Sequence, residues 1–130
     1  STQPNTLFPY TTLFRSQSTV EMAIAIPVIA ILMAAVLQVG LLARDRVVLV
    51  RVTSAAARAA MVEPTDRVVS AELLEHRGSL RVESWSLTGS RSAGGLLTLE
   101  VTARPTPVPL VGLAVSGVRL TERLVVRVEG

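Results

Sequence analysis

The sequence predicts an α+β membrane protein in which one long N-terminal helix packs on a small three-stranded antiparallel sheet. Residues 22–43 are apolar except for Gln38 and Gly40. As a helix rising about 1.5 Å per residue they reach roughly 33 Å, which matches the hydrocarbon core of a bilayer. Helical spacing of apolar residues continues to residue 62, so we expect one transmembrane and continuing helix over residues 18–62. Beyond residue 78 the apolar residues alternate, as in half-buried strands.

Composition narrows the function classes. The chain has 130 residues, so only one small domain can follow the apolar span. It has no cysteine, which excludes disulfides and thiolate metal sites. All 13 basic residues are arginines, but they alternate with carboxylates, the net charge is only +3 and aromatic residues make up 3%. We therefore expect no nucleic-acid partner, because the arginines are interspersed with carboxylates and there is no stacking platform.

The first 16 residues differ from the rest. Residues 6–16 hold both phenylalanines and the tyrosine of the chain, and they resemble the translation of a sequencing adaptor. We treat residues 1–16 as an adaptor artefact or a disordered tail and exclude them from the fold. The expected organisation then has three parts: the excluded N-terminal segment 1–16, a transmembrane and continuing helix in 17–62, and a small α+β extracytoplasmic head in 63–130.

Beyond the span, the long helix should have two faces. Arg44, Arg51 and Arg58 recur every seven residues and share one stripe, either solvated or in contact with lipid headgroups. Small and apolar residues fall on another side, at spacings of four and three: Leu49, Thr53, Ala56 and Ala60. This second face should seat on the sheet.

Pro64 should end this helix, and Thr65 or Asp66 should cap a short second helix that closes at Gly78. Val69 and Leu73 mark its apolar side.

Three strands are expected at 80–87, 96–104 and 118–128, with a polar turn at 89–95. The second strand has one apolar face, made of Leu97, Leu99, Val101 and Ala103. The third should turn apolar residues inward, although Glu122 and Val125 break its pattern; the inward set is Val118, Leu120, Leu124, Val126 and Val128. Between them, the apolar segment 108–115 is either a contact surface for another subunit or the bilayer, or a lid on the core.

The start of the helix carries the strongest motif. Gln17-Ser18-Thr19-Val20-Glu21 stands before the long apolar run. This pattern resembles the class III signal of type IV pilin-like proteins, and residues 17–28 resemble the opening of TadE-like proteins, minor pilins of the tight-adherence (Flp-type) pilus. The resemblance implies a pilin-like fold and a prepilin peptidase that cuts between Ser16 and Gln17. The family pattern has Gly before the cut, whereas this chain has Ser16.

Cleavage there would make Glu21 the fifth residue of the mature chain, where its carboxylate can pair with the new α-amino group of its own or a neighbouring chain. The alternative is an ordinary interfacial acid in the first helical turn. Pro27 lies inside the apolar run and should kink the helix.

The resemblance also implies partners and location. The partners are the membrane, the peptidase and other pilin or pseudopilin subunits, bound through the N-terminal helix. It places the N-terminus in the cytoplasm and the head outside it, in the cell membrane with a single pass. The arginines just after the span, read literally, favour the opposite orientation.

No enzyme, cofactor, metal site or small-molecule substrate is expected. His76 is the lone histidine, with no second ligand type expected near it, and the serines lack a base. Trp85 should be a core or membrane-edge anchor. The rival interpretations are an unprocessed single-span anchor or accessory subunit of a secretion or envelope complex, and a Sec-exported domain with a cleaved signal.

Overall fold

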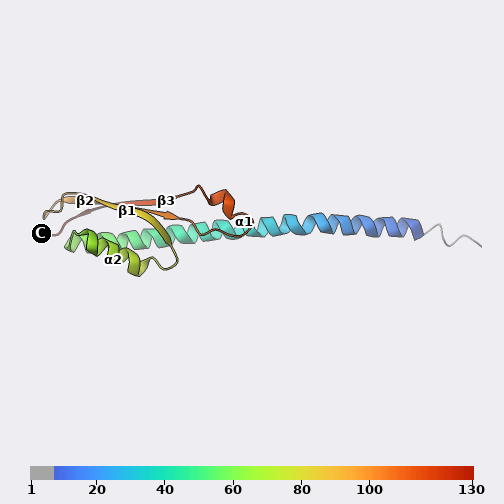
Figure 1. Cartoon of the computed structure of the whole chain (residues 1–130), viewed down its shortest axis with the longest axis horizontal. Coiled ribbons are helices and arrows are strands. Elements are labelled where there is room, and N and C mark those ends of the chain that lie inside the picture. Colours follow the sequence, from blue (N-terminus) through green and yellow to red (C-terminus); the bar gives the residue numbers. More distant parts are fainter. Residues whose placement is uncertain (1–7) are drawn as a thin grey trace, which may run out of the picture.

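The chain forms a long rod that carries a small head on its C-terminal half (Figure 1). A computed structural model describes residues 8–130. Its elements, in order, are α1 (Phe8–Val62), α2 (Asp66–His76), β1 (Arg81–Gly89), β2 (Leu96–Arg104), the 3₁₀ helix η2 (Gly112–Val115) and β3 (Leu120–Arg127). The strands form one antiparallel sheet in the order β1-β2-β3. The predicted fold class, a long apolar helix on a three-stranded antiparallel sheet, is confirmed.

α1 begins earlier than the expected residue 18. Its helical backbone starts at Phe8, and Pro9 stands in the first turn, where a missing N–H is no loss. Neither glycine nor proline occurs between Pro9 and Pro27, and the Thr19 hydroxyl donates to the Arg15 carbonyl at 2.9 Å. Nothing in this stretch therefore ends a helix. Residues 1–7 of the expected N-terminal segment lie outside the described residues, and the division at residue 16 stays a prediction.

The C-terminal half of α1 is the centre of the core. α2 packs on one side of it and the sheet on the other, as Figure 1 shows. The face predicted from spacing is confirmed, since Leu49, Thr53, Ala56 and Ala60 are all fully buried. The predicted arginine stripe faces outward on the same helix. Small alanine side chains let α2 and the sheet approach the helix axis closely.

α2 follows its expected signals. The Thr65 hydroxyl accepts a hydrogen bond from the Val68 N–H, which caps the helix. Val69 and Leu73 are its buried residues. The chain then turns at Gly78, whose φ of +55° is easy for glycine.

The sheet agrees with the prediction most closely at β2, which has the predicted bounds and a fully buried apolar face. β1 extends to Gly89, where φ is +116° and a Cβ atom would collide with the Leu96 carbonyl. β3 starts at Leu120, and Val118 was wrongly expected to face inward, because its N–H joins a turn to the Val115 carbonyl and its side chain is 38% exposed.

β3 keeps a strict geometric alternation in spite of its broken apolar pattern. Glu122 takes a half-buried position on the inner face and Val125 an exposed one on the outer face. Glu122 is accommodated by an ion pair with Arg46 of α1, at 2.9 Å. Trp85 packs partly buried against the core, as one of the two predicted alternatives had it.

Candidate functional site

The N-terminal half of α1 projects from the head as an unpartnered apolar rod (Figure 1). Its most apolar 18-residue window is not buried at all, and the helix is long and apolar enough to cross a bilayer. Large apolar side chains point to every side of it and are each more than half exposed: Val20, Met22, Ile24, Ile26, Val28, Ile29, Ile31, Leu32, Met33, Val36, Leu37 and Val39. A helix that is apolar all round needs an apolar environment. This segment is a candidate membrane anchor.

The residues singled out by the motif all lie on this rod. Ser16, Gln17 and Glu21 are exposed, and within residues 15–130 no ion pair or hydrogen bond of the Glu21 side chain is found. Glu21 stands four residues after Gln17, a rise of about 6 Å along the helix. A charge at Gln17 of the same or a neighbouring chain is therefore within reach of the carboxylate.

Pro27 sits within the uninterrupted helix. Its missing N–H leaves the Ala23 carbonyl without its helical donor, a loss that a neighbouring helix can offset in lipid. The bend expected at this residue stays a prediction.

At the base of the rod, two polar side chains of α1 are buried under the segment that follows β2. Gln38 is 5% exposed and Asp45 is 2% exposed. The Gln38 amide donates to the Thr106 carbonyl at 2.9 Å and accepts from the Val108 N–H at 2.9 Å. Asp45 accepts from the Thr106 N–H at 2.6 Å. We call these three hydrogen bonds the clamp.

The clamp is explained by the alternating prolines at positions 105, 107 and 109. Proline has no N–H, so within residues 105–109 only Thr106 and Val108 can donate from the backbone. Both of these N–H groups are taken up by side chains of α1. Buried backbone groups must find such partners, and here no strand can supply them.

The clamp was not predicted, although the sequence contains a signal for it. Gln38 and Asp45 are seven residues apart, and Asp45 is four before Leu49, so both continue the buried stripe of α1 toward the N-terminus. Polar groups on an otherwise buried stripe require partners. The alternating prolines 60 to 70 residues later mark a stretch whose backbone groups cannot be paired in a strand.

Ion pairs join neighbouring elements of the head to one another. Arg46 joins α1 to β3 through Glu122 and donates to the Thr121 carbonyl at 2.6 Å. Glu83 binds Arg104 at 3.0 Å and Arg119 at 2.7 Å. The pKa of Glu83 is lowered, first by the hydrogen bond from Arg104 and further by Arg119. Glu83 is exposed, so these pairs are structural contacts of the surface.

His76 has closer acidic neighbours than expected. The spacing of α2 places Glu72 and Glu75 around it, with their ligand atoms within 4.8 Å of one another. The prediction that no second ligand type lies near His76 is therefore wrong, because positions three and four residues apart share a helix face. His76 contacts Glu72 at 3.2 Å. The group is largely exposed, and such surface groups are common without a metal ion.

A comparison with known protein families finds a match that includes the apolar rod. Residues 17–58 match the model of the family described as TadE-like protein. This stretch is 42 of the 130 residues, and over it the chain is similar to TadE-like proteins. The resemblance seen in the sequence is confirmed over these residues. No curated protein and no solved structure matches the chain.

The matched stretch begins at Gln17 and ends within the part of α1 that the head covers. It contains Glu21 and Pro27 in the free rod, and Gln38 and Asp45 of the clamp. The matched stretch therefore includes both the exposed apolar surface and the residues that fix the head to it.

Proposed function

We propose that this chain is a TadE-like minor pilin or pseudopilin, a structural, non-catalytic subunit that takes part in assembly of a Tad (Flp-type) pilus. The observation that carries the proposal is the exposed apolar rod, whose residues 17–58 match the TadE-like family. A rod that is apolar on all sides can exchange lipid neighbours for the rods of other subunits with little loss of apolar contact.

In this proposal the rod crosses the cell membrane once, with its N-terminus in the cytoplasm and the head outside. A prepilin peptidase cuts between Ser16 and Gln17, and Glu21 pairs with the new α-amino group during assembly. The family match beginning at Gln17 supports this cut. Because the backbone is helical on both sides of the bond, the first turns of α1 must unwind for cleavage.

The clamp argues against export with a signal removed behind the span. A cut near residue 43 would remove Gln38, leaving the Val108 N–H and the Thr106 carbonyl without their partner. The remaining rival is an unprocessed single-span anchor of a secretion or envelope complex, which uses the same rod without cleavage or assembly.

Two measurements separate the proposal from this rival. In cells that contain the peptidase and the pilus machinery, mass spectrometry of the native protein should show a chain that begins at Gln17. Glu21→Ala should keep membrane insertion and lose incorporation into the pilus, while Glu75→Ala, which removes an exposed carboxylate from the head, should change neither. An intact upstream segment together with normal behaviour of Glu21→Ala would refute the proposal.

A further inference from the structure

Within residues 15–130, the two most exposed large apolar side chains lie between β2 and β3. Leu113 is 88% exposed and Leu110 is 73% exposed. Both belong to residues 105–117, which we call the elbow and which includes η2. The expectation that this segment is a lid on the core holds for one part of it only. Val108 is buried against α1, whereas the tip of the same segment points away from the core.

The elbow lies at the level where the apolar rod ends. Its Val108 is hydrogen-bonded to Gln38 of the clamp, and the apolar run of α1 stops a few residues later, at Ala43. Figure 1 shows η2, in orange-red, beside α1 at the end of the head that faces the free rod. If α1 crosses a bilayer with residues 22–43 in the hydrocarbon, Gln38 lies about 8 Å inside its edge, so the elbow reaches the boundary between hydrocarbon and headgroups.

The strained backbone conformation of Leu110 indicates that the leucine side chain has a role outside the folding of the head. Its φ is 75°, in the left-handed region, and it is the only described non-glycine residue with a positive φ. The turn is closed by a hydrogen bond of 2.7 Å from the Gly112 N–H to the Val108 carbonyl. Glycine or asparagine would adopt this conformation at lower cost. An exposed leucine in this position contributes little to the core, and its strained backbone makes the folded state less stable than glycine or asparagine would.

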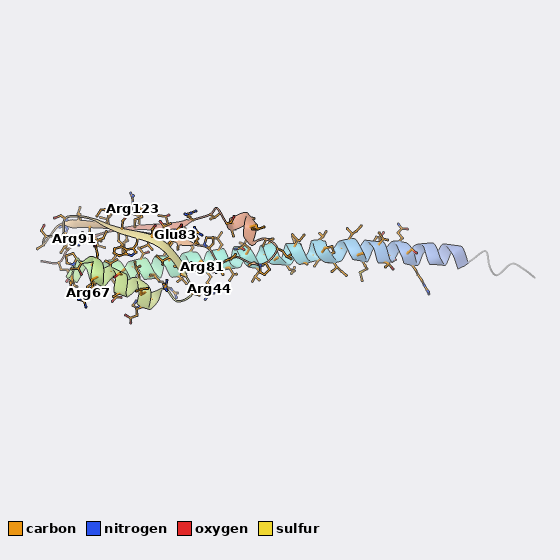
Figure 2. All side chains as sticks on the ribbon, in the orientation of Figure 1. Arg44, Arg67, Arg81, Glu83, Arg91 and Arg123 are labelled. Atoms are coloured by element: carbon orange, nitrogen blue, oxygen red, sulfur yellow. The ribbon has the colours of Figure 1, made fainter. Side chains whose placement is uncertain are left out.

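Charged side chains around the elbow suit a headgroup region. A hollow of about 550 Å³ is lined by Leu110 and Leu113 together with the arginines 81 and 104. Arg81 is exposed, and within residues 15–130 its side chain forms no ion pair. Figure 2 places Arg81 and Arg44 toward the end of the head that faces the rod. Arginine there can keep its stem in apolar surroundings and its guanidinium at the phosphates.

We infer that the elbow is a second membrane contact, which inserts Leu110 and Leu113 into the interface of the leaflet on the head's side. The inference rests on the proposed single-span anchorage. Continuity with the apolar rod favours lipid as the occupant over another protein subunit, because the elbow lies beside the end of the rod that leaves the bilayer. One transmembrane helix alone leaves the head free to tilt; a second contact beside it fixes the tilt.

The absence of cysteine from the chain allows a direct test of depth. Three single-cysteine variants of the full chain, Leu32→Cys in the rod, Leu113→Cys on the elbow and Leu96→Cys at the opposite end of the head, carry a fluorescent label in phosphatidylcholine nanodiscs. Leu96 is the matched control, since it is also an exposed leucine, at 56%. Lipids brominated on the acyl chains then quench labels that lie in the bilayer.

We expect quenching at positions 32 and 113 and none at 96. Quenching at 32 with none at 113 overturns the elbow contact and leaves the anchorage intact, whereas no quenching at 32 overturns the anchorage itself. A label at 113 that is shielded from water but not quenched by bromolipid indicates a protein partner and also overturns the inference.

A second variant tests the same contact, because it should stabilise the fold of the head and at the same time weaken its contact with the membrane. Leu110→Asn relieves the left-handed backbone and should raise the unfolding midpoint of the head. The same change should reduce quenching of the label at position 113. Unchanged quenching in this variant would count against membrane insertion of the elbow, and a folded head, read from Trp85 fluorescence, excludes misfolding as the cause.

Discussion

Replacing Gln38 by leucine should destabilise the head although the change makes the rod more apolar. The variant Gln38→Leu removes the donor to the Thr106 carbonyl and the acceptor of the Val108 N–H. An unsatisfied buried polar group costs about 1–3 kcal/mol, and a part-buried carbonyl costs less because water can reach it. The two losses together amount to about 3 kcal/mol.

For a domain of this size, each kcal/mol corresponds to a shift of roughly 4–8 °C in Tm, so the expected decrease is about 12–24 °C. Trp85, the single tryptophan, packs half-buried against the core and reports unfolding through its fluorescence. The measurement is thermal unfolding of the full chain in detergent micelles. The matched control is Val39→Leu, at the adjacent residue, which is 66% exposed and lies on another side of the helix.

Two results would show that the clamp is not the cause. If Gln38→Leu unfolds at the same temperature as Val39→Leu, the two hydrogen bonds of Gln38 contribute nothing to the stability of the head. A companion variant, Asp45→Asn, keeps an oxygen acceptor for the Thr106 N–H and should lose less than Asp45→Leu. Equal losses in these two variants would indicate that the carboxylate acts through its charge and not through this hydrogen bond.

Three further predictions concern the head, each read from the same unfolding measurement. Thr65→Ala removes the cap of α2 and should lower the free energy of unfolding by about 1 kcal/mol, with Thr65→Ser as the conservative control. Ala56→Leu places a large side chain where the exposed fraction is zero and should cost about 1–3 kcal/mol or more through overpacking; Ala43→Leu, on an exposed part of the same helix, should not. Glu83 has a lowered pKa in the folded protein, so its ion pairs contribute fully above the ordinary carboxyl value of 4.5 and are lost as the pH falls below it through the folded pKa. Glu83→Gln should therefore reduce the stability difference between neutral and acidic pH, and an unchanged pH profile would contradict this.

Local patterns predicted most of the head. β2 was found with its bounds because alternation, flanking glycine and following proline all act within ten residues. α2 was found because its cap, its buried pair and its closing glycine are equally local. The buried stripe of α1 followed from spacing alone. These signals are short-range, so a single sequence contains them in full.

The features that were missed depend on partners far away in the sequence. Gln38 pairs with Thr106 and Val108 across 68 and 70 positions. Its spacing from Asp45 and Leu49 places Gln38 on the buried stripe of α1, but within an apolar run it looks like an isolated polar interruption, and no residue near it shows which groups it pairs with. Glu122 was likewise seen as a break in an apolar pattern, because its ion pair with Arg46 joins two distant elements.

The hydrogen bonds and the ion pair that join the head to α1 are spread along the helix, and their positions determine how the head can move. The clamp holds the head at Gln38, and Arg46 holds β3 about two turns further on. Near the helix end, the Glu129 N–H donates to the Met61 carbonyl at 2.8 Å. From residue 38 to residue 61 this amounts to about 35 Å of helix bound along its length. The head is therefore fixed to its half of α1, and freedom to bend remains only in the free rod, where Pro27 interrupts the backbone hydrogen bonds. Under the proposed function, packing between the rods of neighbouring subunits sets the spacing and orientation of their heads directly, because no flexible linker separates the two.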